Sequence, residues 1–82
     1  MIDDLDPKMW DYYFRIGDQI RKLRKERTKL NYIEFAKQIG MNRKTYYKIE
    51  TGSSEYYISS LLRVLEYYPD ISTDEFFKSV GI

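Results

Sequence analysis

The stretch NYIEFAKQIGMNRKTYYKIETG, at residues 31–52, predicts two short helices separated by a tight turn. Asn31 is a favourable N-cap, and Glu34 three residues later completes a capping box, so we expect a helix to begin there. Gly40 is suited to the left-handed backbone that commonly ends a helix. After one intervening residue, Asn42 can cap a second helix. The chain is therefore expected to turn sharply between two helices that pack against each other.

The apolar residues of this stretch indicate which side of each helix is buried. Phe35, Ala36 and Ile39 form the inner face of the first helix, where the small Ala36 allows the second helix to approach closely. Tyr46 and Ile49, three residues apart, form the inner face of the second helix. Its outer face then carries Arg43, Lys44, Tyr47 and Lys48. Two short helices joined in this way are typical of a helix-turn-helix motif.

A longer helix is expected before this motif, from Pro7 to about Arg27. Asp6 is a suitable N-cap, and a proline at the first helical position loses no hydrogen bond. Apolar residues then recur at intervals of four and three, which is the pattern of an amphipathic helix. They are Met9, Tyr13, Ile16, Ile20 and Leu23. Gly17 interrupts this helix without ending it.

Two shorter helices are expected after the motif. Gly52 ends the second motif helix, and a loop follows at residues 53–57. The next helix carries the apolar residues Ile58, Leu61, Leu62 and Leu65 and stops before Pro69. A capping box of Ser72 and Glu75 then opens a last helix, which carries Phe76, Phe77 and Val80. The sequence thus predicts an all-α domain, with very little that is typical of a strand.

Length and composition exclude several classes of protein. A chain of 82 residues with 43% hydrophobic content supplies one domain with a modest core. It has no cysteine and no histidine, which excludes a disulfide scaffold, a Cys/His zinc module and catalysis by an imidazole base. No carboxylates show a spacing that suggests catalysis. We therefore expect no enzyme activity, no metal and no cofactor.

The charges are distributed unevenly along the chain. Residues 15–48 contain eleven basic and three acidic side chains, a net charge of +8, whereas the remaining residues contain three basic and ten acidic ones, a net charge of −7. This polarity predicts a one-sided field that favours a polyanion. A solvated helical face rich in lysine is the plainer interpretation, and the charge pattern alone leaves both open.

The first residues, MIDDLDPKMW, are acidic and lack a long apolar run, so neither a signal peptide nor a membrane span is predicted. Asp3, Asp4 and Asp6 would be repelled by phosphate. A cation site is one interpretation of this acidic cluster. The favoured interpretation is that Asp6 caps the helix and the other two complement its positive end.

Several pieces of the chain, taken in order, resemble the phage-repressor and Cro-like helix-turn-helix family of bacterial and phage regulators. The pieces are Ile16–Arg21, Leu23–Arg24, Glu34–Asn42 and Thr45–Gly52, and the likeness continues through Leu61–Leu62 to Ser72–Phe76. It covers roughly four-fifths of the chain. The resemblance implies a compact five-helix, lambda-repressor-like domain that docks its third helix, at about residues 43–50, in the major groove of DNA.

The resemblance also assigns the contacts to DNA. The residues expected to contact bases are Arg43, Lys44, Tyr47 and Lys48, since arginine and lysine can reach the acceptors of guanine. The residues expected to contact phosphates are Tyr32, Asn31, Asn42, Lys29 and Thr45, which lie near helix N-termini or the preceding turn. Many family members have a glutamine just after the cap of the first motif helix. Here Tyr32 can donate one hydrogen bond but cannot make a two-ended amide contact.

The family resemblance, and the way in which such proteins bind DNA, each indicate a further set of residues. Glu50 matches a family position whose carboxylate pairs with an arginine of the first helix, here Arg24, so the pair is expected to fix that helix against the third. Helix-turn-helix proteins usually bind paired half-sites about one DNA turn apart, so a homodimer surface is needed. The candidates for a dimer or partner surface are Trp10, Phe14, Phe77, Val80 and Ile82.

These inferences predict a sequence-specific DNA-binding transcriptional regulator. We expect it to occupy double-stranded DNA as a homodimer, without a small-molecule ligand, and to block polymerase as a repressor or to recruit it, with a repressor favoured. It is expected in the cytoplasm, and on the nucleoid when bound. Residues 1–13 are expected to form an acidic and aromatic extension that continues into the first helix, and residues 14–82 the DNA-binding domain. The alternative is an antitoxin or phage-encoded adaptor that uses the same fold mainly to bind protein, which the acidic flanks and surplus aromatic residues favour.

Overall fold

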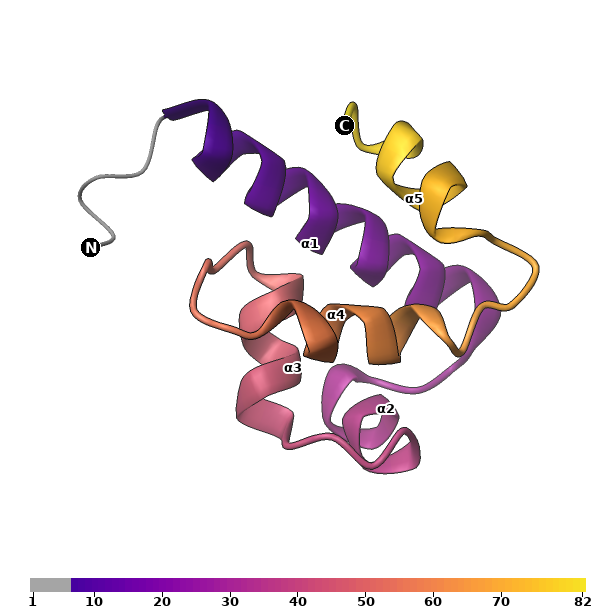
Figure 1. Cartoon of the computed structure of the whole chain (residues 1–82). Helices are drawn as coiled ribbons and strands as arrows, with labels where there is room; N and C mark the ends of the chain where they lie inside the picture. Colours follow the sequence, from indigo (N-terminus) through magenta and orange to yellow (C-terminus); the bar gives the residue numbers. More distant parts are fainter. Residues whose placement is uncertain (1–6) are drawn as a thin grey trace.

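The computed structural model describes residues 7–82, which form five α-helices (Figure 1). The helices are α1 (Pro7–Arg27), α2 (Tyr32–Gln38), α3 (Arg43–Glu50), α4 (Ile58–Leu65) and α5 (Thr73–Ser79). No strand occurs in this part of the chain, so the predicted all-α, five-helix fold is confirmed. Asp3, Asp4 and Asp6, with the predicted cap and cation-site alternative, lie outside the described residues. None of the helices within 7–82 has both the length and the apolar character needed to cross a membrane.

Side-chain caps begin three of the short helices as the sequence predicts. Asn31 Oδ1 accepts a hydrogen bond from Glu34 N at 2.8 Å, and Glu34 Oε1 accepts one from Asn31 N at 2.9 Å. Ser72 and Glu75 make the equivalent reciprocal pair at the start of α5, and the bond from the Ser72 amide lowers the pKa of the Glu75 carboxyl. At the start of α3, Asn42 caps the Lys44 amide at 2.8 Å. The turn before α3 uses Gly40 with φ of 69°, the left-handed conformation expected of it.

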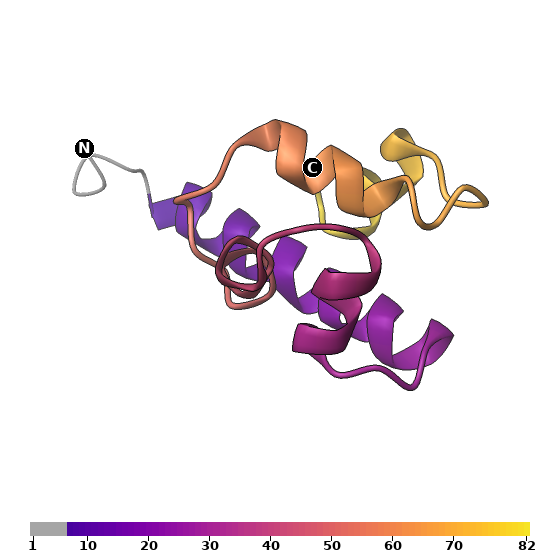
Figure 2. The ribbon, with the colours of Figure 1, turned by 90° about the horizontal axis from the view of Figure 1, so that it is seen from below.

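Helix α3 packs against three other helices, α1, α2 and α4. In Figures 1 and 2, α1 runs the length of the molecule and α4 lies on the outside of the bundle. The Phe35 ring joins α2 to its neighbours, with centroids 5.4 Å from Tyr46 and 6.3 Å from Tyr68. The largest side chains that are almost completely buried are Ile20, Phe35, Tyr46, Ile49, Leu61, Val64 and Phe76.

The four apolar residues that predicted α4 do not all face the core. Ile58 and Leu62 are 62% and 40% exposed. Val64 is fully buried instead, and it packs inward with Leu61 and Leu65 at the i, i+3 and i+4 positions of a helical stripe. The sequence predicted this helix but not its inner face, because a short apolar run does not determine which side of a helix meets the core.

Two arginines of α1 hold the C-terminal part of the chain. Arg27 Nη1 and Nη2 each donate to one carboxylate oxygen of Asp70 at 2.9 Å, and this pairing lowers the pKa of Asp70. Arg15 Nη1 donates to the Val80 carbonyl at 3.3 Å. The end of the chain therefore lies against the N-terminal half of α1.

Gly17 lies where α1 closely approaches α3. The sequence analysis treated this glycine only as an interruption that the helix tolerates. A Cβ atom at this position would lie 2.5 Å from the Ile49 carbonyl oxygen and 2.7 Å from that of Glu50. These neighbours are backbone atoms, which cannot rotate away as a side chain would. The glycine is therefore required by the contact between the two helices.

We predict that Gly17→Ala lowers the free energy of unfolding by about 1–3 kcal/mol, because overpacking outweighs the usual gain of about 0.5–1 kcal/mol when alanine replaces glycine in a helix. Urea unfolding followed by circular dichroism measures this change. Lys25→Ala, at an exposed position of the same helix, is the control and is expected to be nearly neutral. A Gly17→Ala variant as stable as the parent would contradict the assigned contact.

Candidate nucleic-acid interface

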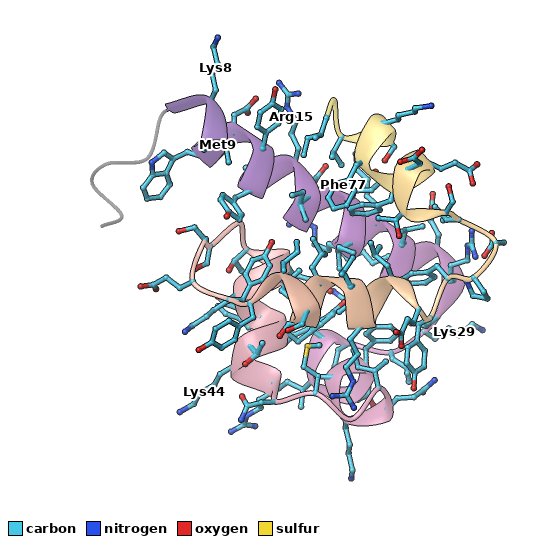
Figure 3. All side chains as sticks on the ribbon, in the orientation of Figure 1. Lys8, Met9, Arg15, Lys29, Lys44 and Phe77 are labelled. Carbon is cyan, nitrogen blue, oxygen red and sulfur yellow. The ribbon has the colours of Figure 1, made fainter. Side chains whose placement is uncertain are left out.

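The outer face of α3 carries a cluster of basic and aromatic side chains. Arg43, Lys44, Tyr47 and Lys48 are all exposed, whereas Tyr46 and Ile49 on the opposite side are completely buried. Figure 3 shows the Lys44 side chain extending away from the start of α3. The alternation of inward and outward residues follows the helical period, so the core contacts of α3 fix which side chains it presents.

Tyr32 at the start of α2 joins this face through a contact with Tyr47. The two rings lie with centroids 5.1 Å apart and planes inclined by 49°. Together with the outer residues of α3, Tyr32 lines an open depression that we call the recognition hollow. It is formed by Tyr32, Arg43, Lys44, Tyr47 and Lys48. The sequence placed Tyr32 among the phosphate contacts but did not predict the ring contact, since it depends on how α2 and α3 pack.

The chemistry of the recognition hollow suits a polyanion with planar bases. Three cationic side chains and no carboxylate line it, so the local potential is positive. The Arg43 guanidinium offers paired N–H donors that match the O6 and N7 acceptors of guanine. The tyrosine hydroxyls can donate to phosphate oxygens, and the rings offer apolar contact to a thymine methyl group.

The other predicted phosphate contacts do not form a single site. Asn42 and Thr45 line a separate depression with Gly40, Met41, Ser59, Ser60 and Arg63. Asn31 caps α2 through Glu34, and Lys29 lies on the opposite side of the view from Lys44 in Figure 3. Arg63 is a basic residue near the motif that the sequence analysis missed, because no local pattern indicates that α4 brings it beside the turn.

An ion pair beneath the interface fixes α3 to α1. Arg24 Nε donates to Glu50 Oε2 at 2.7 Å and Nη2 donates to Oε1 at 3.0 Å, with both side chains buried. The third nitrogen, Nη1, donates to the Leu30 carbonyl at 2.8 Å, so the same guanidinium also holds the turn before α2. The hydrogen bond to Glu50 raises the pKa of Arg24. This pair is the one expected from the sequence.

The buried Tyr46 hydroxyl lies in the same environment. Burial raises its pKa well above the ordinary value of 10.0, and the neighbouring Glu50 carboxylate adds to the rise. Tyr46 therefore stays neutral, with its ring packed against Phe35. Its role is to support the inner face of α3.

The candidate partner residues divide into exposed and buried ones. Trp10, Phe14 and Ile82 are 44%, 61% and 58% exposed. Val80, at 4% exposure, is part of the core, so its inclusion in a partner surface was wrong. Phe77 is half-buried, and its ring packs edge-on against Phe76. Phe77 in α5 and Val80 directly after α5 both pack on the core, which a terminal apolar run in the sequence does not reveal.

A helix-turn-helix whose second helix presents a basic and aromatic face defines a DNA-binding module. The sequence model of the helix-turn-helix family matches residues 20–76. The chain therefore belongs to this family, in its phage-repressor and Cro-like branch, and is a DNA-binding transcription regulator.

One curated relative is the control protein C.MunI of Mycoplasma sp, which is 38% identical over 56 residues. The alignment covers 68% of this chain and 76% of the relative. No solved structure is a significant match. Within residues 7–82, no group of three or more acidic side chains is arranged to hold a metal ion.

We predict that Glu50→Ala lowers the free energy of unfolding by about 3–5 kcal/mol, because it leaves the Arg24 guanidinium buried without its partner. Replacing both residues, Arg24→Met with Glu50→Leu, is expected to recover most of that loss. Urea unfolding of these two variants and of a control variant measures the change in the free energy of unfolding. Arg27→Ala, which removes the exposed pair with Asp70, is the control and is expected to cost much less. Equal losses for Glu50→Ala and Arg27→Ala would refute a structural role for the buried pair.

Proposed function

We propose that this regulator is a repressor that occupies an operator with α3 in the major groove. The observation that carries the proposal is the recognition hollow, in which the outer side chains of α3 and Tyr32 of α2 face the same region of solvent. A major groove about 12 Å wide admits one α-helix. The exposed face of α3, which is basic and aromatic, is the part of the described structure that suits such a docking.

The side chains of the hollow divide naturally between bases and phosphates. Arg43 and Lys44 occupy the first turn of α3, the part of a recognition helix that usually meets base edges. Tyr47 and Lys48, one turn further on, would reach adjacent base pairs. Tyr32 stands at the start of α2, and its hydroxyl would donate to a backbone phosphate. Asn31, Asn42, Thr45 and Lys29 remain proposed phosphate contacts at the edge of this surface.

The short length of α3 supports binding as a homodimer. Eight residues at 1.5 Å per residue give a helix of about 12 Å, which can read few base pairs. Two copies on half-sites about 34 Å apart would double the sequence that is read. Occupancy of such a site blocks polymerase, so we propose repression in the cytoplasm, on nucleoid DNA, without a small-molecule effector.

A second candidate function is protein binding, as in an antitoxin or a phage-encoded adaptor. The exposed side chains of Trp10 and Phe14 on α1 favour it, since large exposed apolar residues often mark a partner site. Neither residue lines the recognition hollow. A protein partner on α1 is therefore compatible with DNA binding by α3.

We predict that the double substitution Arg43→Ala with Lys44→Ala weakens specific binding by about 2–4 kcal/mol, at least about thirtyfold, with an unchanged melting temperature. A duplex selected from a random library by the parent protein serves as the site, and fluorescence anisotropy measures the affinity. The matched control removes two exposed lysines elsewhere, Lys37→Ala with Lys78→Ala, at the same loss of charge.

A salt series separates sequence reading from general electrostatics. The slope of the logarithm of affinity against that of salt concentration reports how many phosphates are neutralised. The Arg43 and Lys44 variant is expected to lose its preference for the selected duplex over a scrambled one, whereas the control variant keeps it. If the Arg43 and Lys44 variant bound the selected duplex as tightly as the parent, the assignment of α3 as reading helix would be wrong.

A further inference from the structure

Two tyrosine rings form one apolar side of the recognition hollow, which we call the aromatic wall. The rings of Tyr32 and Tyr47 pack together with centroids 5.1 Å apart, and both line the hollow, whose volume is about 320 Å³. The three cationic side chains of the hollow suit phosphates and the polar edges of bases. A paired aromatic surface beside them suits an apolar group on the same DNA.

The core holds the aromatic wall in place in the free protein. Tyr32 is partly buried and packs against the hydrophobic core. Tyr47 is 50% exposed, and its ring rests against that of Tyr32. Ordering a free side chain on binding costs free energy, whereas a ring that is already packed loses little further freedom. The wall is therefore a preorganised surface.

The major groove of DNA offers one apolar group, the methyl group at C5 of a pyrimidine. Thymine carries this group, whereas cytosine and the purines do not. 5-Methylcytosine carries the same methyl group at the same place on its edge. The methyl group protrudes into the groove that a reading helix occupies. An aromatic wall beside hydrogen-bond donors is complementary to such a base.

We propose that the aromatic wall reads the C5 methyl group of a pyrimidine, so that the protein favours a base with this group, thymine or 5-methylcytosine, over the same base without it. The proposal rests on the proposed function, in which α3 occupies the major groove. It makes cytosine methylation a property of DNA that the protein senses. A methyl group covers the rings of Tyr32 and Tyr47, and without it they face water.

The spacing along α3 relates the methyl group to the guanine that Arg43 contacts. Arg43 and Tyr47 are four residues apart and line the same hollow, so they are neighbours on one face of the helix. One helical turn rises about 5.4 Å, and successive base pairs of DNA lie about 3.4 Å apart. The methylated pyrimidine is therefore expected within about two base pairs of that guanine.

Modified duplexes test the proposal without changing the protein. In the duplex selected by the parent protein, each thymine is replaced in turn by deoxyuridine, which lacks only the methyl group. Fluorescence anisotropy is expected to show about a fourfold loss of affinity at one thymine of each half-site, the effect of burying one methyl group. A duplex with 5-methylcytosine at that position is expected to bind about fourfold more tightly than one with cytosine.

Substitutions in the wall assign this preference to the rings. Tyr47→Ala is expected to bind the thymine and deoxyuridine duplexes equally. Tyr47→Phe, which keeps the ring and removes the hydroxyl, is expected to keep the fourfold preference. Lys48→Ala on the same face is the control, which is expected to weaken binding to both duplexes alike and to keep the preference. Both positions are exposed, so circular dichroism melting curves are expected to stay close to that of the parent.

The outcomes separate methyl reading from the proposed function. A methyl preference that disappears in Tyr47→Ala and survives in Tyr47→Phe supports the proposal. If no exchange of thymine for deoxyuridine changed the affinity, methyl reading would be overturned, even though the Arg43 and Lys44 variant still lost its preference for the selected duplex. A fourfold loss that persisted in Tyr47→Ala would overturn the assignment to the aromatic wall. Failure of the proposed function has a different sign, unchanged binding by the Arg43 and Lys44 variant.

Discussion

The guanidinium of Arg24 connects the three segments on which the motif depends. It bonds to the Glu50 carboxylate at the end of α3 and to the Leu30 carbonyl in the turn before α2, while its own backbone belongs to α1. A buried charge of this kind is stable only when every donor has a partner. The orientation of α3 is therefore set by polar contacts at its C-terminal end and by apolar contacts along its inner face. Gly17 completes the arrangement, because α1 could not approach the last carbonyls of α3 if that position carried a side chain.

Features that depend on local chemistry were predictable from the sequence. The Asn31 and Ser72 capping boxes, the left-handed Gly40 and the inward Tyr46 all follow from patterns within a few residues, and the observed structure has each of them. The pairing of Arg24 with Glu50 came from the family resemblance, because 26 residues separate them. The close approach at Gly17, the burial of Val64 and the burial of Val80 were missed. Each depends on how helices distant in the sequence pack, which periodicity within one helix cannot specify.

The candidate site shows the same division. The helical period places Arg43, Lys44, Tyr47 and Lys48 on one face of α3, so the composition of that face was available from the sequence. Its connection to α2 was not, because the Tyr32 ring meets Tyr47 only after the two helices have packed. At the position where the family resemblance leads us to expect a glutamine, the start of α2 has an aromatic ring that contacts the Tyr47 ring of α3.

The brevity of α2 and α3 links DNA recognition to the cooperativity of folding. These helices have seven and eight residues, whereas isolated helices shorter than about 12–15 residues are marginal in water. Neither can persist apart from the core formed with α1 and α4, so a partly unfolded molecule lacks the surface that we propose reads DNA. On that proposal, the active fraction of the protein in a cell is its natively folded fraction. By mass action, an operator that binds the native state alone also shifts the folding equilibrium toward it, which makes occupied molecules less susceptible to proteolysis than free ones.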